Sequence, residues 1–424
     1  MDRKKIAREY LNLNQDKIFA MGRALFALPE LGFQERKTTE YIASFLGSAG
    51  IPFESGIAVT GVKASVGDGA GYHIGLVADM DALSAVRNGT RVPLHSCGHS
   101  IQVTVMLTAL GALKQCGLLN GTDVKVSFLG TPAEEFIDFP FRNRLIEQGT
   151  IRYPSGKQNM IALGVFDDVD CALSAHVMGD ETVRFDVNST LAGFMVKKAV
   201  FHGKAAHSGA APQLGRNALH GAVLTMNALS FLKDRFAAED GVQIHPIMTE
   251  GGAEMNIIPE RAVLETYVRA NTKEALFRAG EEFDRCAECC AKALDLTAEV
   301  ENRIGYMPLR QSEALCKIAH RNMRSLCGEN EIAKDIVSGA SGDIGDLGFL
   351  MPALQFGFSG IRGRIHSGDF EIADEAHVYL DTAQVVLDTV LDLAEHPELR
   401  VKNPKFRDDK EFYLKNWLHQ AERE

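Results

Sequence analysis

The chain has 424 residues, of which 46% are hydrophobic and 24% charged, and its formal net charge is −11. This composition is typical of a globular protein long enough for two or more domains. The acidic balance argues against a nucleic-acid or anionic-membrane surface, and no segment reaches the roughly 20 apolar residues of a membrane span. The eight cysteines are scattered and the N-terminus has no apolar signal core, so we expect a cytoplasmic protein without disulfides.

The first part of the chain predicts alternating helices and strands. Residues 1–48 predict two helices, separated by the Pro and Gly of segment 28–33. Apolar runs at 59–66, 73–78, 124–129 and 169–176 predict strands, and a helical pattern begins at His99 and closes near residue 116. Strand, helix and strand in this rhythm indicate an α/β fold, with a mostly parallel sheet and helices on both faces.

Residues 186–304 have the pattern of an inserted module. Strands are predicted at 190–202, 241–250, 261–269 and 296–302, and they alternate with helices at 216–233 and 272–294. Two such units make an α+β, ferredoxin-like module with an antiparallel sheet backed by two helices. We therefore expect one catalytic domain built from residues 1–185 and 305–424.

The part after the insertion predicts four further features. A helix is expected at 311–327, a Gly-rich loop at 338–346, a strand at 353–358 and a long helix at 375–396. The charged segment after Pro397 predicts a surface helix.

Metal-seeking side chains gather at the ends of the predicted strands and in the loops that follow. They are Asp79, Asp81, Cys97, His99, Glu134, Glu135, His176 and His366. Thiolate, imidazole and carboxylate groups suit zinc and similar ions, and open α/β sheets carry their sites at such strand ends. Five ligands suffice for two ions that share a bridging water, and the remaining Glu of the adjacent pair can act as general base. Taken alone, the pattern also suits a buried Cys with capping His residues and a solvated Glu-Glu loop.

Ordered motifs run along nearly the whole chain. They are PELGF at 29–33, ADMDAL at 78–83, HSCGH at 95–99, PAEE at 132–135, AH at 206–207, GRNA at 215–218, GG at 251–252 and NIIP at 256–259, with Arg269 and His366. In these motifs the chain resembles the co-catalytic metallopeptidase and aminoacylase superfamily. Within it, the chain is similar to the amidohydrolase branch of hippurate hydrolase, auxin-conjugate hydrolases and aminobenzoyl-glutamate hydrolase.

The resemblance implies roles for individual residues. The implied ligands of two divalent metal ions per subunit, usually zinc or manganese, are Cys97, His99, Glu135, His176 and His366. Glu134 would be the base, and Asp79 and Asp81 would support the ligands. The inserted module would be a lid that also dimerises, and its His207, often in the partner's site in this family, would steady the oxyanion. Asn256 and Arg269 fall on lid positions that bind the substrate carboxylate or shape the lid; the alternatives are a turn residue and a surface ion pair.

Two departures from the branch bear on the substrate. Ser100 stands where an Asp usually follows the second His, and segment 136–155 replaces a Gly-rich continuation after Glu135. In having an uncharged residue at position 100, the chain resembles the B-subunit type of aminobenzoyl-glutamate hydrolase. The aromatic residues and arginines of the segment, Phe136, Phe139, Phe141, Arg142, Arg144 and Arg152, either line a pocket for an acyl-amino acid or form an outer loop with solvated arginines.

The expected function is that of a metal-dependent amidohydrolase. The substrate is expected to be a small N-acyl amino acid or an aminobenzoyl-glutamate-like amide, and the protein is expected to be a homodimer through the inserted module. A dipeptidase or carboxypeptidase of the same superfamily is the alternative enzyme. A binding homologue that has lost turnover is the alternative outside enzymes, and the retained Glu134 disfavours it.

Overall fold

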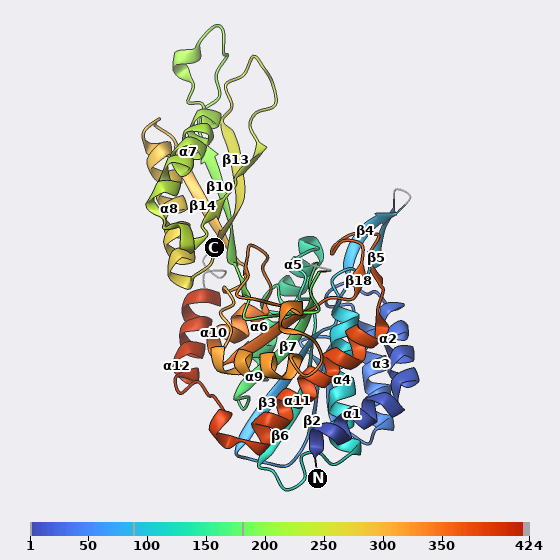
Figure 1. Cartoon of the computed structure of the whole chain (residues 1–424). Helices are drawn as coiled ribbons and strands as arrows, with labels where there is room; N and C mark the ends of the chain where they lie inside the picture. The colour runs from blue at the N-terminus through green and yellow to red at the C-terminus, as the bar shows by residue number, and fades with distance from the viewer. Residues whose placement is uncertain (1, 88–89, 180–181, 419–424) are drawn as a thin grey trace. The chain divides into compact units, whose positions relative to one another are not determined.

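The computed structural model describes residues 2–87, 90–179 and 182–418, and the chain divides into two compact units (Figure 1). The first unit consists of Met1–Ser189, Arg310–Val337 and Asp346–Phe406. The second consists of Thr190–Leu309, Ser338–Gly345 and Arg407–Glu424. The first unit is therefore built from both halves of the chain.

The first unit is organised around an eight-stranded sheet. Its strands, in spatial order, are β1 (Phe53–Ile57), β2 (Gly61–Val66), β6 (Val124–Thr131), β3 (Tyr72–Asp79), β7 (Cys171–Val177), β17 (Ala353–Phe358), β8 (Phe185–Val187) and β15 (Ile332–Lys334). The four central strands, β6, β3, β7 and β17, pair in parallel, whereas β1 and β2 add to one edge in antiparallel fashion. The predicted α/β class with a mostly parallel sheet is confirmed.

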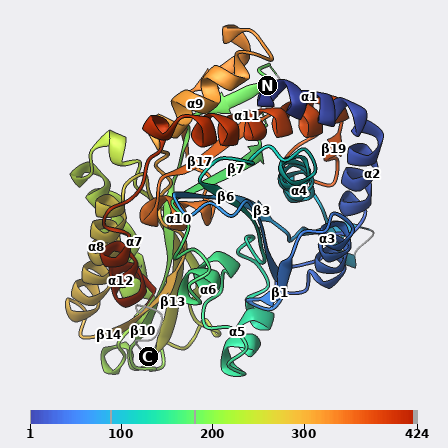
Figure 2. The same ribbon diagram turned by 90° about the horizontal axis from the view of Figure 1, so that it is seen from below.

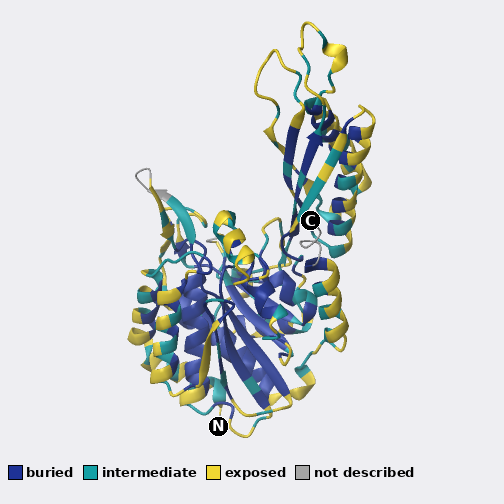
Figure 3. Ribbon diagram, turned by 180° about the vertical axis from the view of Figure 1, so that it is seen from behind, coloured by how far each residue is buried: buried dark blue, intermediate teal, exposed yellow. Residues whose placement is uncertain are grey.

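Helices enclose this sheet. They are α1 (Arg3–Leu13), α2 (Gln15–Phe26), α3 (Arg36–Ser48), α4 (His99–Gln115), α5 (Phe139–Glu147), α6 (Gly156–Ala162), α9 (Glu313–Met323), α10 (Ile344–Leu350) and α11 (Thr382–Glu395). Figure 2 shows α4 and α11 on one side of the sheet and α6 on the other. Because it is covered on both faces, β3 is buried at every position, and Figure 3 shows the central strands buried along most of their length.

Short elements complete the first unit. Two hairpins pair β4 (Leu83–Arg87) with β5 (Thr90–Leu94), and β18 (Ile361–Arg362) with β19 (Glu371–Ile372). Short strand β9 (Thr190–Leu191) begins the second unit in sequence, and β16 (Val337–Ser338) spans a boundary between the two units. None of the helices in the described ranges is long and apolar enough to cross a membrane.

The structure corrects three predictions for the elements of the first unit. The N-terminal segment forms three helices rather than two, because Asn14 leaves helical geometry at φ −107° and its side chain donates to the Tyr10 carbonyl at 2.9 Å. The Gly-rich loop predicted at 338–346 ends early, since α10 begins at Ile344. The helix predicted at 375–396 starts with a π-helical turn, Ala376–Asp381, before α11.

The second unit pairs an antiparallel sheet with two helices. Its strands are β14 (Thr297–Ile304), β10 (Gly193–His202), β13 (Arg261–Ala270), and both β11 (Gln243–Ile244) and β12 (Ile247–Glu250) along the free side of β13. Helices α7 (Ala218–Leu232) and α8 (Lys273–Lys292) pack on each other and on this sheet. The strand predicted at 241–250 is therefore two short strands.

The C-terminal segment differs from the predicted surface helix. Helix α12 (Phe406–Phe412) has no buried residue, but the π-helical turn that follows, Tyr413–Trp417, buries Tyr413 and Trp417. The Trp417 ring lies 5.4 Å from the ring of Phe277 on α8, in an edge-to-face arrangement. Charged residues dominate the composition of this tail, but its few aromatic residues decide where it packs.

Candidate metal centre

The carboxyl ends of the parallel strands bring most of the predicted site residues together. β3 ends at Asp79, β6 ends at Thr131 just before Glu134 and Glu135, and β7 carries His176 at its penultimate position. Parallel strands end at the same edge of a sheet, so these side chains meet there. The loop that contains His366 is joined to this edge by a hydrogen bond from the His366 N–H to the Ser96 carbonyl, at 2.8 Å.

Gly98 allows Cys97 and His99 to face the same cluster. It has a left-handed φ of +80° at the N-cap of α4, and a Cβ at this position would lie 2.8 Å from a methyl group of Val177. A side chain would therefore be strained and would collide with β7. The chain turns sharply between the thiol and the imidazole, and α4 then begins at His99.

Six predicted residues form one compact set of donor atoms. Their groupings are Cys97 with His99 and His176, Cys97 with Glu135 and His366, and His99 with Glu134 and Glu135, and the ligand atoms of each group lie within 4.8 Å of one another. Cys97 Sγ is common to the first two groups, at 3.4 Å from His176 Nε2 and 3.2 Å from His366 Nε2. His366 Nε2 lies 3.5 Å from Glu135 Oε1, and His99 Nε2 lies 3.7 Å from Glu134 Oε2. Sulfur, nitrogen and oxygen atoms in this arrangement match the donors that zinc and similar divalent ions use, and these residues would hold such ions.

Asp81 orients two of these side chains. Its carbonyl oxygen lies 2.9 Å from His99 Nδ1, and its carboxylate accepts the main-chain N–H of Glu135 at 3.0 Å. The carbonyl contact keeps a proton on Nδ1, so Nε2 is the nitrogen that faces the cluster and that a metal ion would bind. His176 is held in the same way, because its Nδ1 lies 2.8 Å from the Val177 carbonyl.

Two buried atoms of the cluster have no hydrogen-bond partner. They are His99 Nε2 and Glu135 Oε1, and both belong to side chains less than 10% exposed. An unpartnered buried polar atom costs roughly 1–3 kcal/mol, so a cation that accepts both lone pairs would remove a real penalty. The residues present therefore fit a metal site.

The acid–base properties of the cluster follow from its burial. Burial, together with the carboxylate of Glu135, raises the pKa of the Cys97 thiol well above its usual range. Burial also raises the pKa of Glu135 to about 7 and lowers that of His176 to about 4. Without a metal, the thiol therefore keeps its proton at neutral pH, and a metal must displace this proton when it binds.

Asp79 has a partner that the sequence reasoning missed. Its carboxylate forms an ion pair with the completely buried Lys157 Nζ and accepts the Thr131 hydroxyl at 2.7 Å. Burial by itself would raise the pKa of Asp79, but the charge of Lys157 outweighs this effect and lowers the pKa to about 2. Asp79 is thus a buried structural charge behind the cluster. Lys157 follows Gly156 just after segment 136–155, and no sequence pattern marked it as a partner of Asp79.

The remaining predicted residues lie in the second unit. His207 is exposed, and its Nδ1 accepts the N–H groups of Gly209 and Ala210 at 3.2 and 3.1 Å. A ring whose Nδ1 accepts these donors carries its hydrogen on Nε2. Asn256 is also exposed and lies beside His207, since its carbonyl accepts the Ser208 N–H at 2.9 Å.

Arg269 is half-buried within the second unit. Its Nη1 donates to the Ser341 hydroxyl at 2.8 Å and to the Gly339 carbonyl at 3.2 Å. The guanidinium also lies over the rings of Phe194 and Tyr267, at 5.6 and 5.4 Å from their centroids. These contacts tie the 338–345 segment to β13.

Segment 136–155 contains a helix and one buried arginine. Nine of its residues form α5, and Phe136 and Phe139 pack edge to face, with ring centroids 4.8 Å apart. Arg144 and Arg152 are exposed, as an outer loop predicts, but Arg142 is only 1% exposed. Its guanidinium binds main-chain carbonyls instead of facing water or a pocket.

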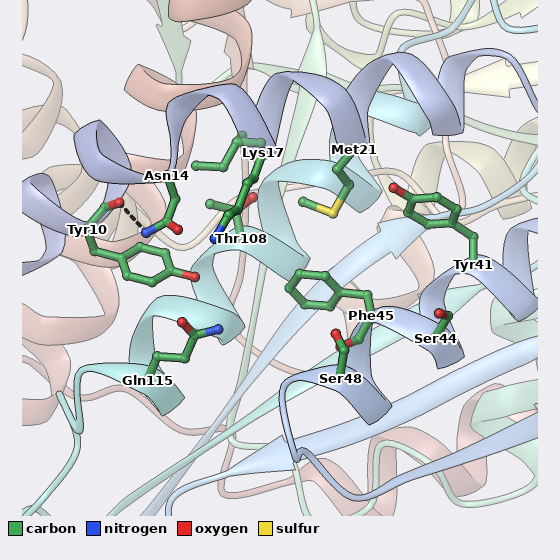
Figure 4. A pocket seen from close by; sticks show the side chains of 11 residues that line it. Tyr10, Asn14, Lys17, Met21, Tyr41, Ser44, Phe45, Ser48, Thr108 and Gln115 are labelled. Atoms are coloured by element: carbon green, nitrogen blue, oxygen red, sulfur yellow. Dashed lines mark hydrogen bonds between the residues drawn. The ribbon is translucent and has the colours of Figure 1, made fainter.

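A cavity of about 420 Å³ lies elsewhere in the first unit, between α1, α2, α3 and α4 (Figure 4). Tyr10, Lys17, Tyr41, Phe45 and Thr108 are among the residues that line it. The lining contains no His, Cys, Asp or Glu, so this cavity offers none of the usual protein ligands of a metal ion.

Comparison with known proteins bears directly on this cluster. The model of peptidase family M20/M25/M40 matches residues 75–392, which include every member of the cluster. The chain belongs to this peptidase family. Membership confirms the resemblance inferred from the motifs and makes the protein a hydrolase of amide or peptide bonds.

Several M20 relatives align over most of the chain. A mouse Xaa-Arg dipeptidase is 26% identical over 419 residues, which cover 93% of this chain and 90% of the dipeptidase. An N-acetyl-L-cysteine deacetylase of Bacillus subtilis is 27% identical over 326 residues, which cover 72% and 71% of the two chains. The fold is similar to that of a dinuclear metal binding M20 peptidase from B. subtilis, with a TM-score of 0.71 at 21% identity, covering 91% of this chain and 99% of that one.

Alkylation of Cys97 tests its place among the M20 metal ligands. In the metal-free protein, labelling should be slow at pH 7 and rise with pH, because burial raises the pKa of the thiol. Saturating metal should block labelling at every pH, since coordination occupies the sulfur. Peptide mass spectrometry measures both, and the exposed Cys289 is the control that metal leaves unchanged. Equal labelling of Cys97 with and without metal at high pH would contradict this assignment.

Proposed function

We propose that the protein is a metal-dependent amidohydrolase that cleaves the amide bond of an N-acyl amino acid or an aminobenzoyl-glutamate-like substrate. The observation that carries the proposal is the buried cluster of Cys97, His99, Glu135, His176 and His366, with the Glu134 carboxylate at its side. When bound there, two divalent ions, zinc or manganese, would polarise the scissile carbonyl and activate water.

Glu134 is the general base of this proposal. Its Oε2 lies 3.7 Å from His99 Nε2, at the side of the cluster, whereas Glu135 Oε1 lies 3.5 Å from His366 Nε2. Adjacent side chains at the end of a strand diverge, which supports one carboxylate as ligand and the other as base. Glu134 would take a proton from the attacking water and deliver it to the leaving amine.

His207 is the proposed oxyanion donor. Because Nδ1 already accepts two main-chain N–H groups, the exposed ring offers an Nε2–H to a ligand. Asn256, next to it, is a candidate for holding the substrate carboxylate. The contacts of Arg269 with Ser341 and Gly339 favour its role in shaping the lid over a direct role in binding.

The second unit is the proposed lid and the surface through which two chains associate. Val223, Leu224 and Phe231 on α7 and Ile247 on the edge strand β12 are exposed apolar residues, Phe231 at 76%. An edge strand beside exposed apolar side chains is suited to pairing with a second copy. Because all eight cysteines are free, a reducing cytoplasmic location is part of the same proposal.

A dipeptidase is the alternative, and the similarity to an Xaa-Arg dipeptidase over 93% of the chain supports it. A free α-amine near the metals would require an acidic partner, and Ser100 supplies none at the position where the branch has an acid. Metal-loaded protein should therefore hydrolyse N-acyl amino acids or aminobenzoyl-glutamate faster than dipeptides with a free amine. A kcat/KM that is higher for Xaa-Arg dipeptides would favour the alternative, and hydrolysis of none of these would overturn the proposal.

Replacement of the base separates catalysis from metal binding. Glu134→Gln should lower kcat by roughly 10²–10⁴-fold or more, because the amide cannot accept a proton from water. Its metal content should stay near that of the wild type, because Glu134 is not a ligand in this assignment. Elemental analysis beside steady-state kinetics measures both. Loss of metal together with activity would show that the roles of Glu134 and Glu135 are wrongly assigned.

Mixing two inactive variants tests whether a site is completed by the partner chain. Glu134→Gln and His207→Ala should each be nearly inactive, the second because a lost oxyanion donor costs about 10²–10³-fold in kcat. A heterodimer of the two contains one site with both residues intact if His207 acts in trans, so mixing should restore part of the activity. No recovery in confirmed heterodimers would place His207 in its own chain's site or outside catalysis.

A further inference from the structure

The turn that carries Glu134 and Glu135 has an unfavourable backbone. Ala133, the residue before them, has a φ of +53°, in the left-handed region that costs a residue with a side chain roughly 1–2 kcal/mol. A turn of this kind persists only when its surroundings hold it. The contacts of its main chain therefore decide where the two carboxylates lie.

Three side chains from different parts of the first unit bind this main chain. Glu35, at the N-cap of α3, accepts the Ala133 N–H at 2.8 Å, and Asp81 accepts the Glu135 N–H at 3.0 Å. The third is Arg142 on α5, which donates from Nη2 to the Glu135 carbonyl. The N–H and the carbonyl of Glu135 are thus each bound to a buried side chain.

Arg142 also holds the other end of segment 136–155. Its Nη1 donates to the Pro154 carbonyl at 2.6 Å, so one guanidinium joins the first part of the segment to its last. The planar fork of Arg suits two acceptors at once, which a lysine ammonium with its single nitrogen does not match. A buried guanidinium is costly, so its place among main-chain carbonyls indicates a specific structural use.

The space around this contact is filled by backbone. A Cβ on Gly32 would lie 2.8 Å from both Arg142 Nη2 and Ala133 Cα, and a Cβ on Gly156 would lie 1.8 Å from the Pro132 carbonyl oxygen. The turn is therefore packed between the 32–35 loop, α5 and the start of α6. The same α6 supplies Lys157, which pairs with Asp79.

We propose that Arg142 is a positioning residue of the metal site: by binding the carbonyls of Glu135 and Pro154 it fixes the turn that presents Glu134 and Glu135. This role rests on the metal-hydrolase function proposed above for those two residues. Segment 136–155 then supports the turn from behind. The positive charge of Arg142 is bound by main-chain carbonyls of the same protein. Arg144, two residues further along the same helix, is exposed and has no part in the contact.

Arg142→Ala and the matched control Arg144→Ala test this role in two measurements. The first is amide hydrogen exchange of peptides covering 132–136 in the metal-free protein, which reports the turn whether or not metal binds. The second is metal affinity by competition with a chromophoric chelator. Arg142→Ala should speed exchange in the turn and weaken metal binding by roughly 10–100-fold, as loss of a group that orients a ligand does. Arg144→Ala should change neither.

The outcomes separate this proposal from the proposed function. If the wild type binds no metal but exchange in the turn responds to Arg142→Ala, the hydrolase function fails and the contact stands. If metal binds and Arg142→Ala matches Arg144→Ala in both measurements, or only lowers the melting temperature, the positioning role is overturned. If Arg142→Ala does not fold, the Arg142→Lys variant decides. It keeps the positive charge but lacks the fork that binds both carbonyls, so it should show the same two changes to a smaller degree. Wild-type exchange and metal affinity in this variant would overturn the role.

Discussion

Parallel pairing of β3, β6 and β7 is the constraint on which the candidate site depends. Parallel strands must end at one edge of the sheet, and the connections between them return on its faces. Asp79, the Glu134–Glu135 pair and His176 meet at that edge although almost a hundred residues separate the first from the last. The left-handed Gly98 then turns Cys97 and His99 toward the same point. An antiparallel order of these strands would send alternate ends to opposite edges and disperse the cluster.

The cluster is a set of buried polar atoms that do not satisfy one another. His99 Nε2 and Glu135 Oε1 lack partners, and burial raises the pKa of both Cys97 and Glu135. Desolvation is the common cause: the interior disfavours the thiolate and the carboxylate, and it leaves lone pairs without donors. A divalent cation offsets each of these costs at once. The burial that disfavours the thiolate and the carboxylate without a metal therefore favours binding of a cation that neutralises them.

Behind the ligands, buried charges hold the main chain in place. Lys157 pairs with Asp79, Asp81 binds both His99 and the Glu135 N–H, and Arg142 binds the Glu135 carbonyl. These residues come from segments far apart in sequence, and none of them needs to touch a substrate. Precise placement of ligands requires this kind of support, because a turn with a left-handed alanine does not hold its geometry alone.

The sequence by itself determined the fold class and predicted the side chains that gather in the buried cluster. Apolar runs that stop at His, Cys, Asp and Glu predict a parallel sheet with a polar edge, and periodicity is a local property that needs no tertiary contact. The sequence pattern missed the helix break at Asn14 and the docking of Trp417, because each of these features depends on one side chain. Tertiary structure alone decided the use of Arg142 and Lys157. Arginine and lysine side chains are normally solvated, so the sequence predicts them at the surface. Only the packing of α5 and α6 against the turn after β6 provides the buried carbonyls and the carboxylate that bind these two side chains.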